Sequence, residues 1–420
     1  MIILNEITRK QRQSNFELLR IIAMMGIILY HLVLHHINYD RFALITTERG
    51  PNFWHLDIIQ IFYTFGQIAN TIFILITGYF LIDKKDINVI KPAGKLLNRT
   101  YMTVFILLGL AYLFNRFQYP IKTNMDIDMS LNGWWFIGYY IFVIVFAKYI
   151  LNPFLQRLRK KDFFGFVVIF IILLGFMEIF DILDNLNMEN LAIGISVYSV
   201  GAYLRLYEPL SKVRTWTLLL FLTSFFVLEV IEYKVNTQRI TQVFFNQESI
   251  DTFVNEPFTN TLWSSSVLFL LCSIVVFELF RRLPIGSIRW VNWLSKSVFT
   301  VYLFHESNFF RNLLVRGETL PTRLGILNKP ATIIVNSGEE KGLEVVLKDP
   351  ETWLELPDFL NISQVFQDRG AVVGTGYMLL LMVVIFLMGV LLDLVIRMLN
   401  GLLKKLFATD IRNLRQQFYD

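Results

Sequence analysis

The chain is poor in the residues that cross-link or solvate a protein in water. Only one of its 420 residues, Cys272, is a cysteine, so an intramolecular disulfide is excluded and cysteine-rich metal patterns are absent. Charged residues make up 17% of the chain. Nucleotide-binding loops, Ser-His-Asp spacings, internal repeats and low-complexity tracts give no signal. The first hydrophobic segment lacks the small-residue cleavage site of a signal peptide, so we expect it to be retained.

Apolar residues fill most of the chain instead. Hydrophobic residues make up 55% of it, and the mean hydropathy is +0.51. Runs of 18 or more apolar residues recur, which is the length a helix needs to cross a hydrocarbon core of ~30 Å. The sequence therefore predicts an all-α, polytopic membrane bundle of about ten transmembrane helices. The predicted spans are residues 15–36, 56–82, 100–117, 133–152, 163–183, 189–207, 215–233, 260–280, 297–315 and 373–399.

Lysine and arginine are divided unequally between the two sets of connections. The ends and loops on the amino-terminal side hold 24 of the 39, and those on the other side hold 12. Cytoplasmic loops carry this excess, so both termini are predicted in the cytoplasm of a multi-pass plasma-membrane protein. We divide the chain into a cytoplasmic N-terminus (1–14), a transmembrane domain (15–399) with a long extracytoplasmic loop (316–372), and a cytoplasmic tail (400–420). The net charge of +5 follows from this topology and does not indicate nucleic-acid binding.

Two ionisable residues, Arg20 and His31, lie inside the first predicted span. They are eleven residues apart, which is about 20° beyond three helical turns, so they share one face at a rise of about 16 Å. Ionisable groups are costly in a membrane and usually functional there. A permanent cation near one membrane surface is thus predicted in line with a titratable base deeper in the membrane.

The cation Arg20 suits an anion site, because a guanidinium never deprotonates and matches phosphate oxygens. Lys95 and Arg99, one turn apart at the start of the third span, add charge on the same side of the membrane. Simpler interpretations remain open. Arg20 pairs with Glu17 or extends to the interface, and the other two residues belong to an ordinary positive-inside loop.

A second histidine, His305, lies in the ninth predicted span beside Tyr302. The two are three residues apart and therefore adjacent on a helix, and Glu306 follows on the same side. A histidine with a hydroxyl is usable for acid–base catalysis, whereas a structural hydrogen-bond network is the alternative. The pair His31 and His35 has metal-ligand spacing but lacks a third ligand, so no metal is expected.

At these residues the chain resembles the membrane-bound acyltransferase family 3, whose members are O-acyltransferases of cell-surface glycans. The resemblance covers the whole hydrophobic body. Its most specific element is an arginine, ten residues and a histidine in the first span, here Arg20 and His31. Supporting strings are F73-I-L-I-T-G-Y79, the basic pair Lys95 and Arg99, G133-W-W-F136 and V301-Y-L-F-H-E306.

The resemblance implies an O-acyltransferase that moves an acyl group, with acetyl expected, from cytoplasmic acyl-CoA to a hydroxyl of an extracytoplasmic or lipid-linked glycan. It assigns catalysis to His31 and donor binding to Arg20. We expect Lys95 and Arg99 to add to the donor site, and His305 and Tyr302 to assist catalysis by positioning the acceptor or donating to the oxyanion. Acyl-CoA is then a co-substrate, and no cofactor is bound. The alternative is a transporter or flippase of a glycan or lipid-linked sugar, in which the same ionisable residues bind substrate or relay protons.

Overall fold

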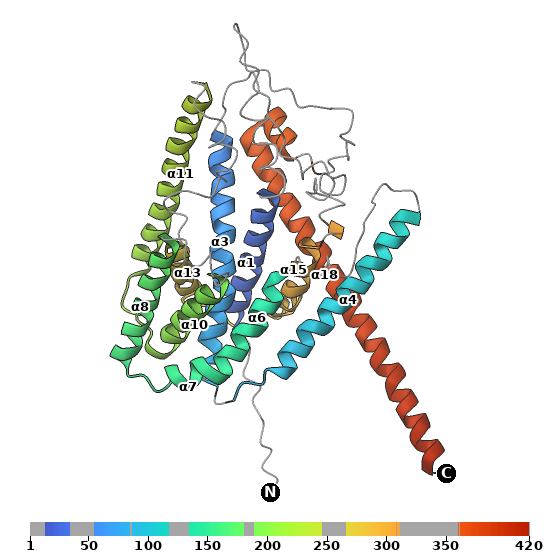
Figure 1. Ribbon diagram of the computed structural model, residues 1–420. Coiled ribbons are helices and arrows are strands. Elements are labelled where there is room, and N and C mark those ends of the chain that lie inside the picture. Colours follow the sequence, from blue (N-terminus) through green and yellow to red (C-terminus); the bar gives the residue numbers. More distant parts are fainter. Residues whose placement is uncertain are drawn as a thin grey trace.

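The structure, a computed structural model, is helical throughout the part of the chain that it describes (Figure 1). It describes residues 13–33, 54–84, 86–116, 134–179, 189–245, 266–307, 309–310, 360 and 362–419. These residues contain no strand, which confirms the predicted all-α fold. Most of the predicted loop 316–372 and the residue His35 lie outside the described residues.

In the described part of the chain, ten helices form the bundle, and short helical segments connect some of them. The helices are α1 (Ser14–Leu32), α3 (Trp54–Leu81), α4 (Ile90–Arg116), α6 (Trp135–Phe146), α8 (Lys160–Ile179), α10 (Glu189–Tyr207), α11 (Thr215–Phe245), α13 (Ser266–Arg281), α15 (Val298–His305) and α18 (Ile362–Tyr419). The short segments are the π-helix η2 (Ala147–Leu151), α7 (Asn152–Leu155), α14 (Arg289–Leu294) and the 3₁₀-helix η3 (Ser295–Ser297).

Five helical stretches in the described part are long and apolar enough to cross a membrane. They are Ser14–Leu32, Ile61–Leu81, Ile90–Leu113, Phe136–Leu155 and Asp368–Lys405. Each of the ten predicted ranges overlaps a helix, but the number of crossings and the cytoplasmic position of the termini stay predictions. Figure 1 places the start of α1 and the end of α18 on the same side of the bundle, as an even number of crossings requires.

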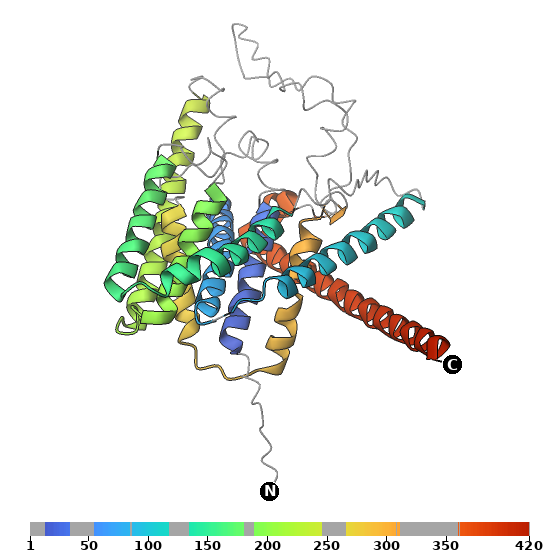
Figure 2. The ribbon, with the colours of Figure 1, turned by 60° about the horizontal axis from the view of Figure 1, so that its bottom comes forward.

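Two helices differ from their predicted ranges. The helix α15 ends at His305, ten residues before the predicted end of the ninth span. The helix α18 begins at Ile362 and continues to Tyr419, through the predicted boundary between the transmembrane domain and the tail. Its one interruption is Gly370, whose φ of 79° lies in the left-handed region that glycine adopts without strain. Figure 2 shows the last part of α18 projecting beyond the bundle.

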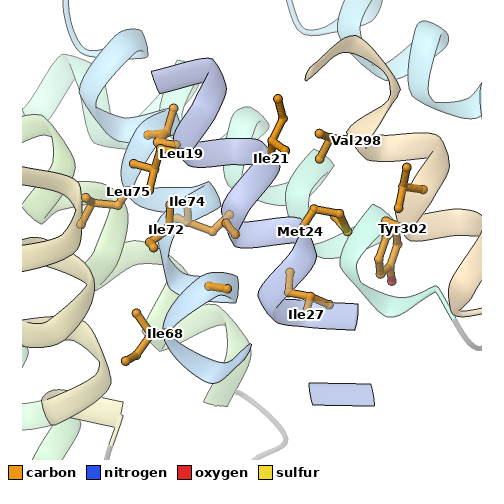
Figure 3. Close-up of a cluster of buried hydrophobic side chains, with 14 of the residues drawn as sticks. Leu19, Ile21, Met24, Ile27, Ile68, Ile72, Ile74, Leu75, Val298 and Tyr302 are labelled. Carbon is orange, nitrogen blue, oxygen red and sulfur yellow. The ribbon is translucent and has the colours of Figure 1, made fainter. Parts of the chain in front are cut away.

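The core of the bundle is formed by α1, α3 and the elements packed against them. Leu19 of α1 faces Leu75 of α3 on one side, and Met24 on the other side points toward Val298 and Tyr302 of α15 (Figure 3). All five side chains are buried. The helix that carries Arg20 and His31 is therefore held in position by apolar contacts on two sides.

Close backbone contact joins α3 to α10. A Cβ atom added to Gly78 would lie 2.2 Å from the carbonyl oxygen of Tyr198, and one added to Gly201 would lie 2.3 Å from that of Leu75. Only glycine permits helices to approach this closely. Gly78 and Gly201 are therefore packing residues of the contact between α3 and α10.

Replacing Gly78 by alanine should lower the thermal unfolding temperature of the purified protein. The neighbour that obstructs the new methyl group is backbone, so the helices must separate, and overpacking of this kind typically costs ~1–3 kcal/mol. Gly109→Ala is the control, because nothing lies within 4 Å of the Cβ position there. Equal unfolding temperatures for the two variants would contradict the packing role.

Candidate active site

His31, His305 and Glu306 meet where the last turn of α1 reaches the end of α15. The Nδ1 atom of His31 lies 2.8 Å from Oε1 of Glu306 and 3.0 Å from Nε2 of His305. His305 and Glu306 are 3% and 4% exposed, whereas the His31 side chain keeps 16% of its surface exposed. The structure therefore brings the two predicted histidines together and adds a carboxylate to them.

Because α15 ends at His305, both His305 and Glu306 are directed into this cluster. Glu306 has φ −91° and ψ 0°, a sparsely populated conformation in which active-site residues recur. Its N–H still donates to the carbonyl of Tyr302, while the Ser307 hydroxyl donates to the carbonyl of Phe304. These bonds fix the turn, and consecutive residues His305 and Glu306 both reach His31 from it.

The hydrogen bonds of His305 determine where the proton of His31 lies. The Nδ1 atom of His305 is 2.8 Å from the carbonyl oxygen of Val301, which only accepts, so this nitrogen carries the proton. In the neutral ring, Nε2 of His305 is then an acceptor that faces Nδ1 of His31. The hydrogen bond to this nitrogen holds a proton on Nδ1 of His31, and the Glu306 carboxylate lies 2.8 Å from the same atom as an ion-pair contact. The lone pair of a neutral His31 is consequently on Nε2, the nitrogen available to act as a base.

Tyr302 lies one turn before this cluster. Its ring centroid is 6.0 Å from that of His305 and 5.8 Å from that of Phe136, which belongs to α6. The tyrosine is 7% exposed and buried between α15 and α6. Its predicted role as a hydroxyl that assists His305 stays a prediction.

Arg20 is paired with Glu17 on the same helix. Its Nη1 atom donates to both carboxylate oxygens, each at 3.1 Å, as the interpretation of a local i, i+3 pair supposed. Glu17 is nearly buried, while the Arg20 side chain keeps 32% of its surface exposed. This exposure leaves part of the guanidinium accessible to an anion, so the donor-site role stays a prediction.

Arg99 has a more enclosed environment than Lys95. The Arg99 guanidinium donates to the carbonyl of Lys296 at 2.8 Å and lies 3.4 Å from Asp393, whereas Lys95 is exposed one turn earlier. Asp393 is fully buried and also accepts hydrogen bonds from Ser297 and Thr300. The predicted basic pair is thus one exposed lysine and one arginine anchored to η3 and α18.

Glu306 is the site residue that the sequence analysis did not select. The sequence contained a signal for it, because a carboxylate next to a histidine near the end of an apolar segment is costly unless it is paired. The prediction of a continuous helix over 297–315 led to Glu306 not being selected. On such a helix residues 305 and 306 point about 100° apart, and only the turn after α15 directs both to His31.

The structure has apolar helices of membrane-spanning length. One of them carries a histidine that lies between a carboxylate and a second histidine. These two features define a membrane protein with groups suited to proton transfer. The sequence matches the family described as acyltransferase domain, acyltransferase family 3, over residues 13–317. This match covers most of the chain and includes every predicted site residue, so the chain belongs to that family. No curated protein and no solved structure matches the chain.

Proposed function

We propose that this membrane acyltransferase is an O-acetyltransferase that uses cytoplasmic acetyl-CoA to acylate a hydroxyl of an extracytoplasmic or lipid-linked glycan. The observation that carries the proposal is the His31 cluster. A base whose tautomer is fixed by a hydrogen bond and that lies beside a carboxylate suits activation of a hydroxyl, which is the difficult step in ester formation.

The reaction follows from the position of the proton on His31. Nε2 of His31 removes the proton of the acceptor hydroxyl while the oxygen attacks the thioester carbonyl, and Glu306 stabilises the imidazolium that forms. The tetrahedral intermediate then collapses, the carbon–sulfur bond breaks, and the CoA thiolate takes the proton from His31. The products are the ester and CoA, and no other reactant is consumed. A route through an acyl group on His31 leads to the same products.

Donor binding is proposed at the other end of α1. Arg20, Lys95 and Arg99 would contact the phosphates of CoA, which charge-assisted hydrogen bonds from lysine and arginine recognise well. The thioester arm would then extend along α1 for the about 16 Å between Arg20 and His31. Tyr302 and His305 would position the acceptor or donate a hydrogen bond to the oxyanion.

Replacing Arg20 by alanine should weaken acetyl-CoA binding to the purified protein. Removing one partner of a partly buried charge contact costs about 2 kcal/mol or more, which is a ~30-fold rise in Kd. Arg159→Ala is the control, since Arg159 forms an i, i+3 pair with Asp162 at the exposed start of α8. Calorimetry with acetyl-CoA measures both, and unchanged affinity in Arg20→Ala would mean that Arg20 pairs only with Glu17.

The function itself is tested with purified protein in proteoliposomes that contain labelled acetyl-CoA inside and a glycan acceptor outside. We expect release of CoA inside and label in an ester of the glycan. Mass spectrometry of surface glycans from cells with and without the protein identifies the acceptor. Movement of glycan across the membrane without CoA release would instead support a transporter.

A further inference from the structure

Three atoms able to bind a metal ion converge at the junction of α1 and α15. They are Nδ1 of His31, Nε2 of His305 and Oε1 of Glu306, and all lie within 4.8 Å of one another. Their separations are 2.8, 3.0 and 3.9 Å. Ligand atoms around a tetrahedral zinc ion, with bonds of ~2.0–2.2 Å, lie about 3.3–3.6 Å apart. The observed separations bracket this range, so small side-chain movements suffice to admit the ion.

The surroundings of the three atoms also suit zinc. Two imidazoles and one carboxylate form a zinc-binding set that leaves a fourth position open. A ligand histidine usually donates its other N–H to a carbonyl or carboxylate, and His305 does so to Val301. His305 and Glu306 are buried and therefore held in place, while the partial exposure of His31 gives access to the site.

We propose that His31, His305 and Glu306 bind a zinc ion reversibly and that this ion inhibits the enzyme. Binding follows from the cluster alone, whereas inhibition rests on the proposed function. Zinc on Nδ1 of His31 occupies the lone pair there and confines the single ring proton to Nε2. The ring then has no lone pair with which to accept the proton of the acceptor hydroxyl. The same ion also removes Glu306 from its contact with His31.

Binding is tested by calorimetric titration of the purified, metal-free full chain with zinc chloride. We expect about one zinc ion per chain, and affinity at least ~10-fold weaker in His305→Ala and in Glu306→Gln. Cys272→Ser is the control, because it removes the one cysteine of the chain, a residue type that commonly binds zinc, and should leave the affinity unchanged. Thermal unfolding of each variant without zinc establishes that it is folded, and zinc should raise the unfolding temperature of the wild type and of Cys272→Ser more than that of the two cluster variants.

The outcomes test the metal site and the proposed acyltransferase function independently. No zinc binding to the wild type, or equal affinity in both cluster variants, would overturn the site. Loss of acyl transfer over the same zinc concentrations, with recovery after a chelator is added, would support inhibition, and full activity of the zinc-saturated enzyme would overturn it. If no acyl transfer is observed under any condition, the proposed function fails, and the calorimetric result still decides the metal site.

Discussion

His31→Ala should abolish acyl transfer while leaving expression, membrane insertion and acetyl-CoA binding nearly intact. The reason is that the side chain supplies general-base catalysis, typically worth ~10²–10⁴ in rate, and lies about 16 Å along α1 from Arg20. CoA release from labelled acetyl-CoA and calorimetric binding of the donor measure the two properties separately.

His31→Gln is the more specific variant. Glutamine keeps a hydrogen-bonding group beside Glu306 and His305 but does not take up a proton at neutral pH. We expect its activity to be as low as that of His31→Ala. His35→Ala, one turn further along the sequence, should have a mild effect. Near-normal turnover in a well-expressed His31→Gln preparation would exclude proton transfer by His31 and make His305 the next candidate.

Glu306→Gln should lower the turnover number by roughly 10²–10⁴, with little change in donor affinity. The amide removes the charge that stabilises the imidazolium, and its NH₂ group donates where the carboxylate accepts. Initial rates at saturating acetyl-CoA measure the effect.

A surface carboxylate provides the matched control for this variant. Glu208 lies beside Arg281 with 53% of its side chain exposed, and Glu208→Gln should retain wild-type turnover. An unchanged turnover number in Glu306→Gln would show that the carboxylate is a structural partner of His31 only. A raised KM for acetyl-CoA with unchanged turnover would contradict the assignment in a different way, because it would place Glu306 in donor binding.

The helical fold and the position of His31 relative to Arg20 can be predicted from local sequence patterns. Apolar run length predicts the helices, and the spacing of Arg20 and His31 predicts their common face. The contact between His31 and His305 cannot be predicted from local sequence, because the two histidines are 274 positions apart. The contact depends on how α1 packs against α15. Periodicity describes one helix at a time and contains no information on such a pair.

Helix ends were the other feature that the sequence did not reveal. Three polar residues, Glu306, Ser307 and Asn308, follow His305, but apolar residues resume at Phe309, and the predicted span therefore continued to residue 315. The turn is fixed by side-chain hydrogen bonds such as that of Ser307, which compete with the helix only in the folded protein. For the same reason the environment of Arg99 was missed, because Asp393 comes from a distant part of the chain.

Asp393 links the two ends of the proposed reaction path. One buried carboxylate of α18 contacts Arg99 of α4, Arg397 of its own helix, and Ser297 and Thr300 at the beginning of α15. A disturbance at Asp393 should therefore reach the helix of the proposed donor site and the helix that carries His305 together. In a random-mutagenesis screen for lost acylation, we expect Asp393 substitutions to appear beside those of His31, His305 and Glu306, although Asp393 has no proposed role in binding either substrate.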